Sequence, residues 1–213
     1  GRKINMVLNY YDDKAVNELI KRISEDIKKS LSERRYNHSI GVMKKAGELA
    51  KIYGENINKA KIVGLAHDIA KEMPNKEKIK YANENNIEID DIERVNVGLL
   101  HGKIGADICK IKYGFAQDMQ DAIRYHTTGN ENMDILAKII FVADKIEDGR
   151  RYKDVEKMRQ LAKAREIAKE NLDRAVLFKI DSSLQHTIMK GELIHLDGIK
   201  TRNKLIAELE YGY

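Results

Sequence analysis

Six residues with metal-ligating side chains lie at similar positions in successive predicted helices. Four of the six histidines, joined by two aspartates, fall on the apolar faces or at the inner ends of successive predicted helices. These residues are His38, His67, Asp68, His101, His126 and Asp144. A single histidine on an apolar face is more often a core residue than a ligand. The joint pattern is more specific, because an unpaired buried aspartate costs on the order of several kcal/mol and therefore requires a nearby cation.

The donor types restrict which metal could provide that cation. Cys109 is the only cysteine, so the chain can form neither an internal disulfide nor a thiolate cluster. Nitrogen and oxygen donors suit iron, manganese, zinc and similar first-row ions, and six donors are too many for one tetrahedral ion. We therefore expect two ions, with Asp68 bridging them. The bridge is feasible because adjacent helical residues such as His67 and Asp68 point in different directions. The alternative is that Lys71, one turn after His67, neutralises Asp68 without a metal.

Two metal ions about 3.5 to 4 Å apart favour one type of chemistry. Such pairs activate water for in-line attack at phosphorus and stabilise the oxygens of the displaced group. The six residues therefore predict a metal-dependent phosphohydrolase.

Helices must position these residues, because the chain has a single proline, Pro74, and almost no strand-like alternation. The fold class is therefore predicted as all-α. An apolar stripe with three- and four-residue spacing predicts a first helix between Val16 and Leu31. The next helix covers about 33 to 53 and ends at Gly54. Asn58 is expected to cap a third helix, which contains His67 and closes at Pro74.

The remaining pattern predicts helices as far as the C-terminus. A polar helix covers about 75 to 86, and a less regular stretch begins at Asp90 or Asp91. His101 begins a helix that includes Ile111 on its apolar face and ends at Gly114, and Asp118 caps the helix that leads to His126. Another helix carries Asp144. The rest is predicted as a short helix from about Asp154, a long helix through Ile167 and Ile188 to Gly191, and a last helix after Gly198.

Length and composition are consistent with one helical domain over residues 1–213. We expect a metal-site core at about 31–150 and a helical extension at about 154–213. Hydrophobic residues make up 42% and charged residues 34% of the sequence, as in amphipathic helices. No run of about 18 apolar residues predicts a membrane span, and we expect a cytoplasmic protein. Whether the chain forms a homodimer is left open.

The net charge of +5 favours an anionic small molecule over nucleic acid as the partner. The basic residues are scattered among acidic neighbours, and the basic stripe typical of nucleic-acid-binding proteins is missing. A modest positive field suits a polyphosphate.

Five sequence blocks carry a resemblance to a known family. They are RYNHS (35–39), GLAHDIAK (64–71), LLHGKIGA (99–106), RYHTTG (124–129) and VADKIE (142–147). In this order they resemble the HD-domain phosphohydrolases, and within them the YqeK type, which is similar to the symmetrical bis(5'-nucleosyl)-tetraphosphatases. The resemblance implies an HD-domain helical bundle with a long C-terminal helix. It extends from about residue 14 to the end, including GELIH (191–195) and TRN (201–203).

The resemblance also implies roles for individual residues. His38, His67, Asp68 and Asp144 would hold one metal, and Asp68, His101 and His126 the other. Asp68 and Lys71 would be catalytic, with Lys71 beside the substrate phosphate. The substrate-binding residues would be Arg35, Lys71, Thr127, Thr128, Gly129, Arg150 and His195. Surface arginines and an ordinary turn remain the alternative for Arg35, Arg150 and the Thr127–Gly129 loop.

The reaction implied by the resemblance is cleavage of diadenosine tetraphosphate into two ADP, through attack of a metal-bridging hydroxide on an inner phosphorus. Two divalent or mixed-valence ions would be bound, with iron expected and manganese or cobalt as alternatives. The rival readings are an HD phosphohydrolase of another nucleotide and a nucleotide-sensing module without turnover. Asp148 and Leu196 depart from the family, since proline is expected at both positions; this bears on loop shape and substrate fit.

Overall fold

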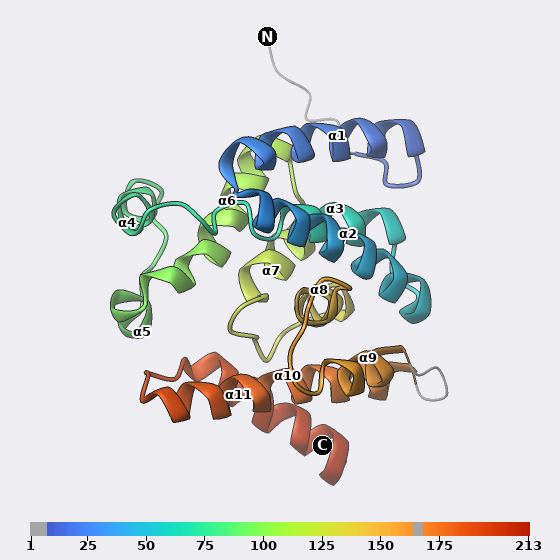
Figure 1. Cartoon of the computed structure of the whole chain (residues 1–213), viewed down its shortest axis with the longest axis vertical. Helices are drawn as coiled ribbons and strands as arrows, with labels where there is room; N and C mark the ends of the chain where they lie inside the picture. Colours follow the sequence, from blue (N-terminus) through green and yellow to red (C-terminus); the bar gives the residue numbers. More distant parts are fainter. Residues whose placement is uncertain (1–7, 164–167) are drawn as a thin grey trace.

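The computed structural model describes residues 8–163 and 168–213, and every regular element in these ranges is helical (Figure 1). The predicted all-α class is therefore confirmed. Ile167, predicted within the long C-terminal helix, lies outside the described residues. None of the described helices is both long and apolar enough to cross a membrane.

Three helices form the N-terminal part: α1 (Asp13–Ser30), α2 (Glu33–Tyr53) and α3 (Ile57–Ala66). Local sequence explains their ends. The Asp12 and Ser32 side chains accept hydrogen bonds from first-turn amides of α1 and α2. Gly54 ends α2 at a φ of 75°, as predicted, because glycine adopts the left-handed conformation without a Cβ clash.

The third helix differs from its prediction at both ends. Asn56 caps α3, whereas the Asn58 side chain donates to the Tyr10 carbonyl in the segment that precedes α1. The helix ends at Ala66 rather than continuing towards Pro74. Beyond that point the backbone forms turns, in which the Lys71 amide donates to the Asp68 carbonyl three residues back. His67 and Asp68 therefore follow the helix instead of lying inside it.

The middle of the chain forms α4 (Asn75–Glu84), α5 (Asp91–Val95), η1 (Val97–Leu100), α6 (His101–Tyr113), α7 (Gln117–Tyr125) and α8 (Ile135–Ile146). Two local predictions here were wrong. Ala116, not Asp118, precedes α7, and the Asp118 carboxylate pairs with Lys59 instead. Ile111 is 67% exposed, because it lies on the solvent face of α6.

The C-terminal part contains α9 (Val155–Lys163), α10 (Ala168–Lys190), α11 (Leu196–Ile206) and a π-helical turn η2 (Ala207–Tyr211). The last helix begins at Leu196, before Gly198, because the His195 ring accepts the Asp197 amide as an N-terminal cap. Ile188, predicted on the apolar stripe, is 63% exposed near the end of α10. In Figure 1, α1 and the C-terminal helices occupy opposite ends of the molecule.

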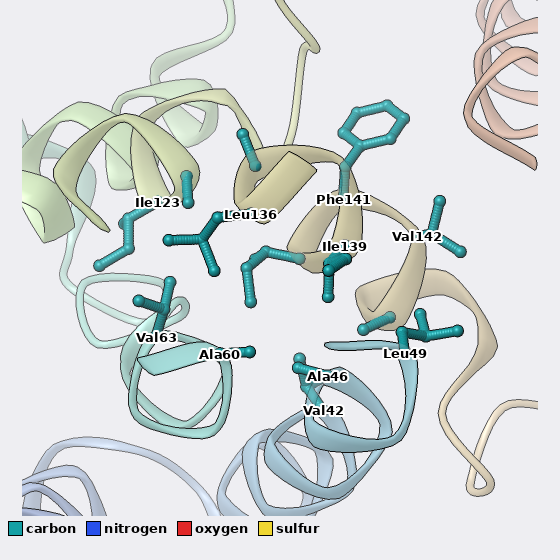
Figure 2. Close-up of a cluster of buried hydrophobic side chains, with 14 of the residues drawn as sticks. Val42, Ala46, Leu49, Ala60, Val63, Ile123, Leu136, Ile139, Phe141 and Val142 are labelled. Atoms are coloured by element: carbon teal, nitrogen blue, oxygen red, sulfur yellow. The ribbon is translucent and has the colours of Figure 1, made fainter. Parts of the chain in front are cut away.

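Helix α8 is the centre of the hydrophobic core. It packs against α2, α3 and α7 and also against α10. Figure 2 shows Leu136 and Ile139 of α8 facing Val63 and Ala46, while the Phe141 ring projects the other way. One hydrophobic cluster extends from Val16 to Leu205, so the N- and C-terminal helices share the same core. Asp144 is thereby fixed on a helix that has packed neighbours on both sides.

Helices α2 and α3 approach each other at Gly64. A Cβ at this position would lie 3.0 Å from the Val42 carbonyl oxygen and 3.1 Å from the Met43 Cα. Both atoms belong to the α2 backbone, which cannot move aside as a flexible side chain can. Gly64 therefore permits the close packing that holds the following His67 and Asp68 in place.

Gly64→Ala should lower the free energy of unfolding by about 1–3 kcal/mol through overpacking. Gly105→Ala in α6 is the matched control, because its Cβ would make ordinary contacts at 3.4 Å with the Ile123 and Ile69 side chains. The control should be neutral or stabilising by up to about 1 kcal/mol. Chemical denaturation monitored by circular dichroism measures both, and equal midpoints would contradict the close-packing argument.

Candidate metal centre

The structure brings the six predicted ligands together from five parts of the chain. His38 comes from α2, His67 and Asp68 from the turn after α3, His101 from the start of α6, His126 from the end of α7 and Asp144 from α8. The Nε2 atoms of His38 and His67 lie 2.9 Å and 3.3 Å from Asp144 Oδ1. The Nε2 atoms of His101 and His126 lie 3.3 Å and 3.4 Å from Asp68 Oδ1.

The cluster divides into two groups that share Asp68. One contains His38, His67, Asp68 and Asp144, and the other contains Asp68, His101 and His126; within each group the ligand atoms lie within 4.8 Å of one another. Asp68 Oδ1 faces the second group, whereas Oδ2 lies 3.5 Å from His67 Nε2 and 3.9 Å from His38 Nε2. The two oxygens are therefore directed to different groups, as a bridging carboxylate requires.

Hydrogen bonds at Nδ1 orient three of the histidine rings. In His67, His101 and His126, Nδ1 lies 2.6–2.7 Å from the carbonyl oxygen three residues earlier. These carbonyls belong to Gly64, Gly98 and Ile123, respectively. Because a carbonyl can only accept, each Nδ1 carries the proton and each Nε2 presents a lone pair. Second hydrogen bonds of this kind are typical of metal-ligating histidines.

The Nε2 atom of His67 provides a direct test of whether a metal fits. The His67 side chain is fully buried, and its Nε2 has no hydrogen-bond partner among the described residues. A buried acceptor without a partner is costly in a folded protein. A divalent cation would satisfy this lone pair and neutralise Asp68 and Asp144 at the same time. The residues present therefore fit a divalent metal.

The fourth histidine is oriented by a carboxylate. His38 Nδ1 lies 3.3 Å from Glu147 Oε1, and Glu147 is itself 5% exposed. The Glu147 carboxylate also accepts the Gly149 amide at 2.6 Å, which fixes the loop after α8. Although Glu147 lies in one of the motif blocks, the sequence analysis assigned it no role. Its signal was its place three residues after Asp144 in that motif block, a spacing that brings two side chains to the same face of a helix.

The electrostatics of the cluster keep the His101 ring neutral and both carboxylates ionised. Burial lowers the pKa of His101 to about 4, so the ring is neutral near pH 7. Burial alone would raise the pKa of Asp68, but the His67, His101 and His126 rings outweigh it and hold the pKa well below its ordinary value. Burial also opposes ionisation of Asp144, yet Lys179, followed by neighbouring histidines, keeps its pKa well below the ordinary value.

Lys179 is a residue of the site that the sequence analysis missed. Its Nζ lies 3.4 Å from Asp144 Oδ2 and donates to the Phe141 carbonyl at 2.7 Å and the His126 carbonyl at 3.1 Å. Burial lowers its pKa to about 8. A signal was present in the sequence, because Lys179 lies seven residues after Leu172 on the apolar side of α10.

Basic residues surround the open side of the cluster. Arg35 Nη1 lies 3.2 Å from Asp68 Oδ2, and Arg150 Nη2 lies 3.3 Å from Asp144 Oδ1. Among the described ion pairs, Asp68 therefore pairs with Arg35 and not with Lys71, which makes neutralisation by Lys71 alone the weaker explanation. A cleft of about 190 Å³ opens over the ligands, and its cationic lining residues are Arg35, Lys71, Lys145, Arg150 and Lys179.

The loop after α7 contributes to the cleft and to a neighbouring cavity. Thr127 Oγ1 lies 3.3 Å from Nε2 of both His101 and His126 and lines the cleft. Thr128 lines the cavity on the other side. Gly129 adopts a φ of 75° and packs against Thr201, so it shapes the turn and does not border the cleft.

His195 and the two positions that lack the expected proline lie away from the ligands. His195 lines the neighbouring cavity, and its Nε2 lies 2.8 Å from Asp90 Oδ2. Leu196 follows it as the first residue of α11 and is 61% exposed. Asp148 Oδ1 pairs at 3.0 Å with the buried Lys45. The two departures therefore affect local loop structure and not the cluster.

Comparison with known proteins agrees with this geometry. The family model described as "HD domain" matches residues 35–149, a range that contains all six residues of the cluster. This chain is a member of the HD-domain family. An HD superfamily hydrolase from Clostridium acetobutylicum, described as involved in NAD metabolism, has a similar structure with a TM-score of 0.83 and 39% identity, covering 88% of this chain and 97% of that one.

Two relatives of known name match most of this HD-domain protein. The symmetrical bis(5'-nucleosyl)-tetraphosphatase of Halalkalibacterium halodurans is 36% identical over 183 residues, which is 85% of this chain and 94% of that protein. The protein of the same name from Bacillus subtilis is 33% identical over 182 residues, with the same shares. The resemblance carried by the five sequence blocks is thus confirmed at the level of the family.

Asp68→Ala should remove metal from the protein while the helical fold persists. The parent protein should carry close to two first-row metal ions per chain, since Asp68 is shared by both groups. The variant should retain less than about half of that content, because metal binding depends on the full ligand set. Elemental analysis and circular dichroism measure the two quantities. The control is Asp121→Ala, since Asp121 is a partly exposed aspartate of α7 that pairs with Arg124. Full metal content in Asp68→Ala would exclude the bridging role of Asp68.

Proposed function

We propose that this protein is a metal-dependent hydrolase that cleaves diadenosine tetraphosphate symmetrically into two molecules of ADP. The observation that carries the proposal is the carboxylate of Asp68, shared by two ligand groups beneath a cleft lined by lysines and arginines. The two tetraphosphatases that match 85% of the chain support the choice of substrate.

The six ligands would hold two first-row metal ions, and such a pair supplies an activated water and neutralises charge on phosphate oxygens. The donor set contains imidazole and carboxylate groups without thiolates, which suits iron, manganese or cobalt. We propose iron as the native metal, with manganese and cobalt as alternatives. The protein fixes the ligands through the carbonyls that hold their Nδ1 atoms.

The chain's own cations bind and orient the phosphate groups. Arg35 and Arg150 line the cleft, and their planar guanidinium groups match the geometry of phosphate oxygens. Lys71 also lines the cleft and contributes a point charge that would stabilise the departing ADP. Thr127 Oγ1 is close enough to the ligand nitrogens to donate to a phosphate oxygen bound there.

Two other functions remain as alternatives within the same site. One is hydrolysis of a different nucleotide, which the metal centre would also support because it contacts phosphate only. The other is nucleotide sensing without turnover. The complete ligand set, together with Lys71 and the arginines around the cleft, favours an enzyme over a sensor.

Product analysis tests the proposed reaction. After loading with iron, manganese or cobalt, the enzyme should convert diadenosine tetraphosphate to ADP alone, because cleavage of the central anhydride leaves each half as a complete ADP. Chromatography identifies the nucleotides, and reaction in isotopically labelled water locates the attacked phosphorus. Equal amounts of ATP and AMP would refute symmetrical cleavage. No reaction with any of the metals would favour the other-nucleotide or sensing functions.

Arg150→Ala should raise the KM for diadenosine tetraphosphate by at least about tenfold, as expected from the loss of a charge-assisted hydrogen bond to phosphate. Metal content should change much less, since the six ligands remain. Arg151→Ala is the matched control, because Arg151 is exposed, lies next in the sequence and does not line the cleft. Steady-state kinetics and metal analysis of the same samples provide the measurement. Equal KM values for the two variants would show that Arg150 does not bind the substrate.

A further inference from the structure

The turn that follows α8 carries Arg150 into the metal cleft. Glu147, Asp148, Gly149 and Arg150 form a four-residue turn, in which the Arg150 amide donates to the Glu147 carbonyl at 2.9 Å. The Arg150 guanidinium then folds back towards α8. Its Nε donates to the Asp144 carbonyl at 3.0 Å, and its Nη2 lies 3.3 Å from Asp144 Oδ1. The position of the guanidinium therefore depends on the shape of this turn.

Arg159 of α9 holds both ends of the turn. Its Nε donates to the Ile146 carbonyl at 3.0 Å, and its Nη2 donates to the carbonyls of Glu147 at 2.9 Å and Arg150 at 3.2 Å. Ile146 is the last residue of α8, where a carbonyl lacks an intrahelical partner. The other two carbonyls belong to the first and last residues of the turn. The Arg159 side chain, which is 14% exposed, therefore fixes the two ends relative to each other and to α8.

Two further contacts restrain the residues within the turn. The Glu147 carboxylate accepts the Gly149 amide at 2.6 Å, and a Cβ at Gly149 would lie only 2.9 Å from Glu147 Oε2. Lys45 of α2, which is 2% exposed, pairs at 3.0 Å with Asp148 Oδ1. Asp148 occupies the second position of the turn, where proline is favoured because its ring fixes φ. The pair with Lys45 therefore restrains the residue that stands in place of the expected proline.

Arg150 requires this support because its surroundings are cationic. Arg35, Lys145 and Lys179 line the same cleft. Burial, followed by the charge of Arg150, lowers the pKa of Lys145, because the two cations repel each other. The Arg150 side chain is 33% exposed, so solvent is accessible to it. With a loose turn, the guanidinium would leave the cleft for water.

We propose that Arg159 is a positioning residue for phosphate binding and that it acts through Arg150. The proposal rests on the proposed function, which assigns Arg150 to the substrate phosphate. Arg159 is not among the described residues that line the cleft, so its contribution to binding is indirect. It holds the turn in the conformation that presents the Arg150 guanidinium, and less conformational freedom is then lost when phosphate binds.

Arg159→Met tests this role with inorganic pyrophosphate as the probe. Methionine keeps an apolar stem but removes all three hydrogen bonds to the turn. Calorimetry on the metal-loaded proteins should show at least about fivefold weaker binding than in the parent, with unchanged metal content, since the six ligands remain. Arg22→Met is the matched control, because Arg22 of α1 also donates to a carbonyl of another helix, that of Lys112 at 3.0 Å. The control should bind pyrophosphate as the parent does.

A double variant shows whether Arg159 acts through Arg150. In the Arg150→Ala background, Arg159→Met should weaken pyrophosphate binding by less than about twofold, because the group that it positions is gone. Equal weakening in both backgrounds would overturn the proposal. So would parent-like affinity of Arg159→Met with only a lower denaturation midpoint, which is the result expected of a residue that stabilises the fold and nothing else.

Arg159→Lys keeps the test decisive where the methionine variant does not fold. Lysine retains the charge, but one ammonium cannot reproduce the planar fork that reaches three carbonyls, so pyrophosphate should bind at least about twofold more weakly. Affinity equal to that of the parent would overturn the proposal, as would unchanged affinity in Arg150→Ala, because Arg159 would then have no phosphate-binding group to position. None of these measurements depends on hydrolysis, so a failed positioning role is distinguished from a failed reaction assignment.

Discussion

The structure depends on the burial of two carboxylates among four imidazole rings. Asp68 and Asp144 lie within hydrogen-bond or ion-pair distance of histidine nitrogens from four different parts of the chain. Buried carboxylates are tolerated only when cations and hydrogen bonds compensate for lost hydration. Arg35, Arg150 and Lys179 supply part of that compensation. Among the described residues His67 Nε2 has no hydrogen-bond partner, and a divalent metal would supply the rest.

Helix ends, rather than helix interiors, provide most of the ligands. His67 and His126 cap the C-termini of α3 and α7, and His101 follows η1. The final carbonyls of a helix lack intrahelical partners, so a histidine at this position can donate its Nδ1 proton to a carbonyl three residues earlier. The same hydrogen bond satisfies the backbone and fixes Nε2 towards the cluster. Local helix termination and ligand orientation therefore have one cause.

Helix α8 connects the metal centre to the C-terminal helices. Asp144 faces the ligands, and Phe141 on the same helix borders the cavity formed with α10 and α11. Lys179 of α10 contacts both Asp144 and the Phe141 ring. The C-terminal helices thus do more than extend the domain, since they contribute a buried cation to the centre and the walls of the adjacent cavity. A change in the packing of α10 would affect both spaces together.

The sequence by itself determined the all-α class, most helix bodies and the six residues of the cluster, because apolar periodicity and residue type are local properties. The residue that caps α3 could not be read from the sequence, because Asn56 and Asn58 have the same side chain and only the contact of Asn58 with Tyr10 distinguishes them. Tertiary structure alone decided that Asp68 directs its two oxygens to different groups and that Lys179 reaches Asp144. It also decided the cavity beside Thr127, since its walls come from segments that meet only when α10 and α11 pack under α7 and α8.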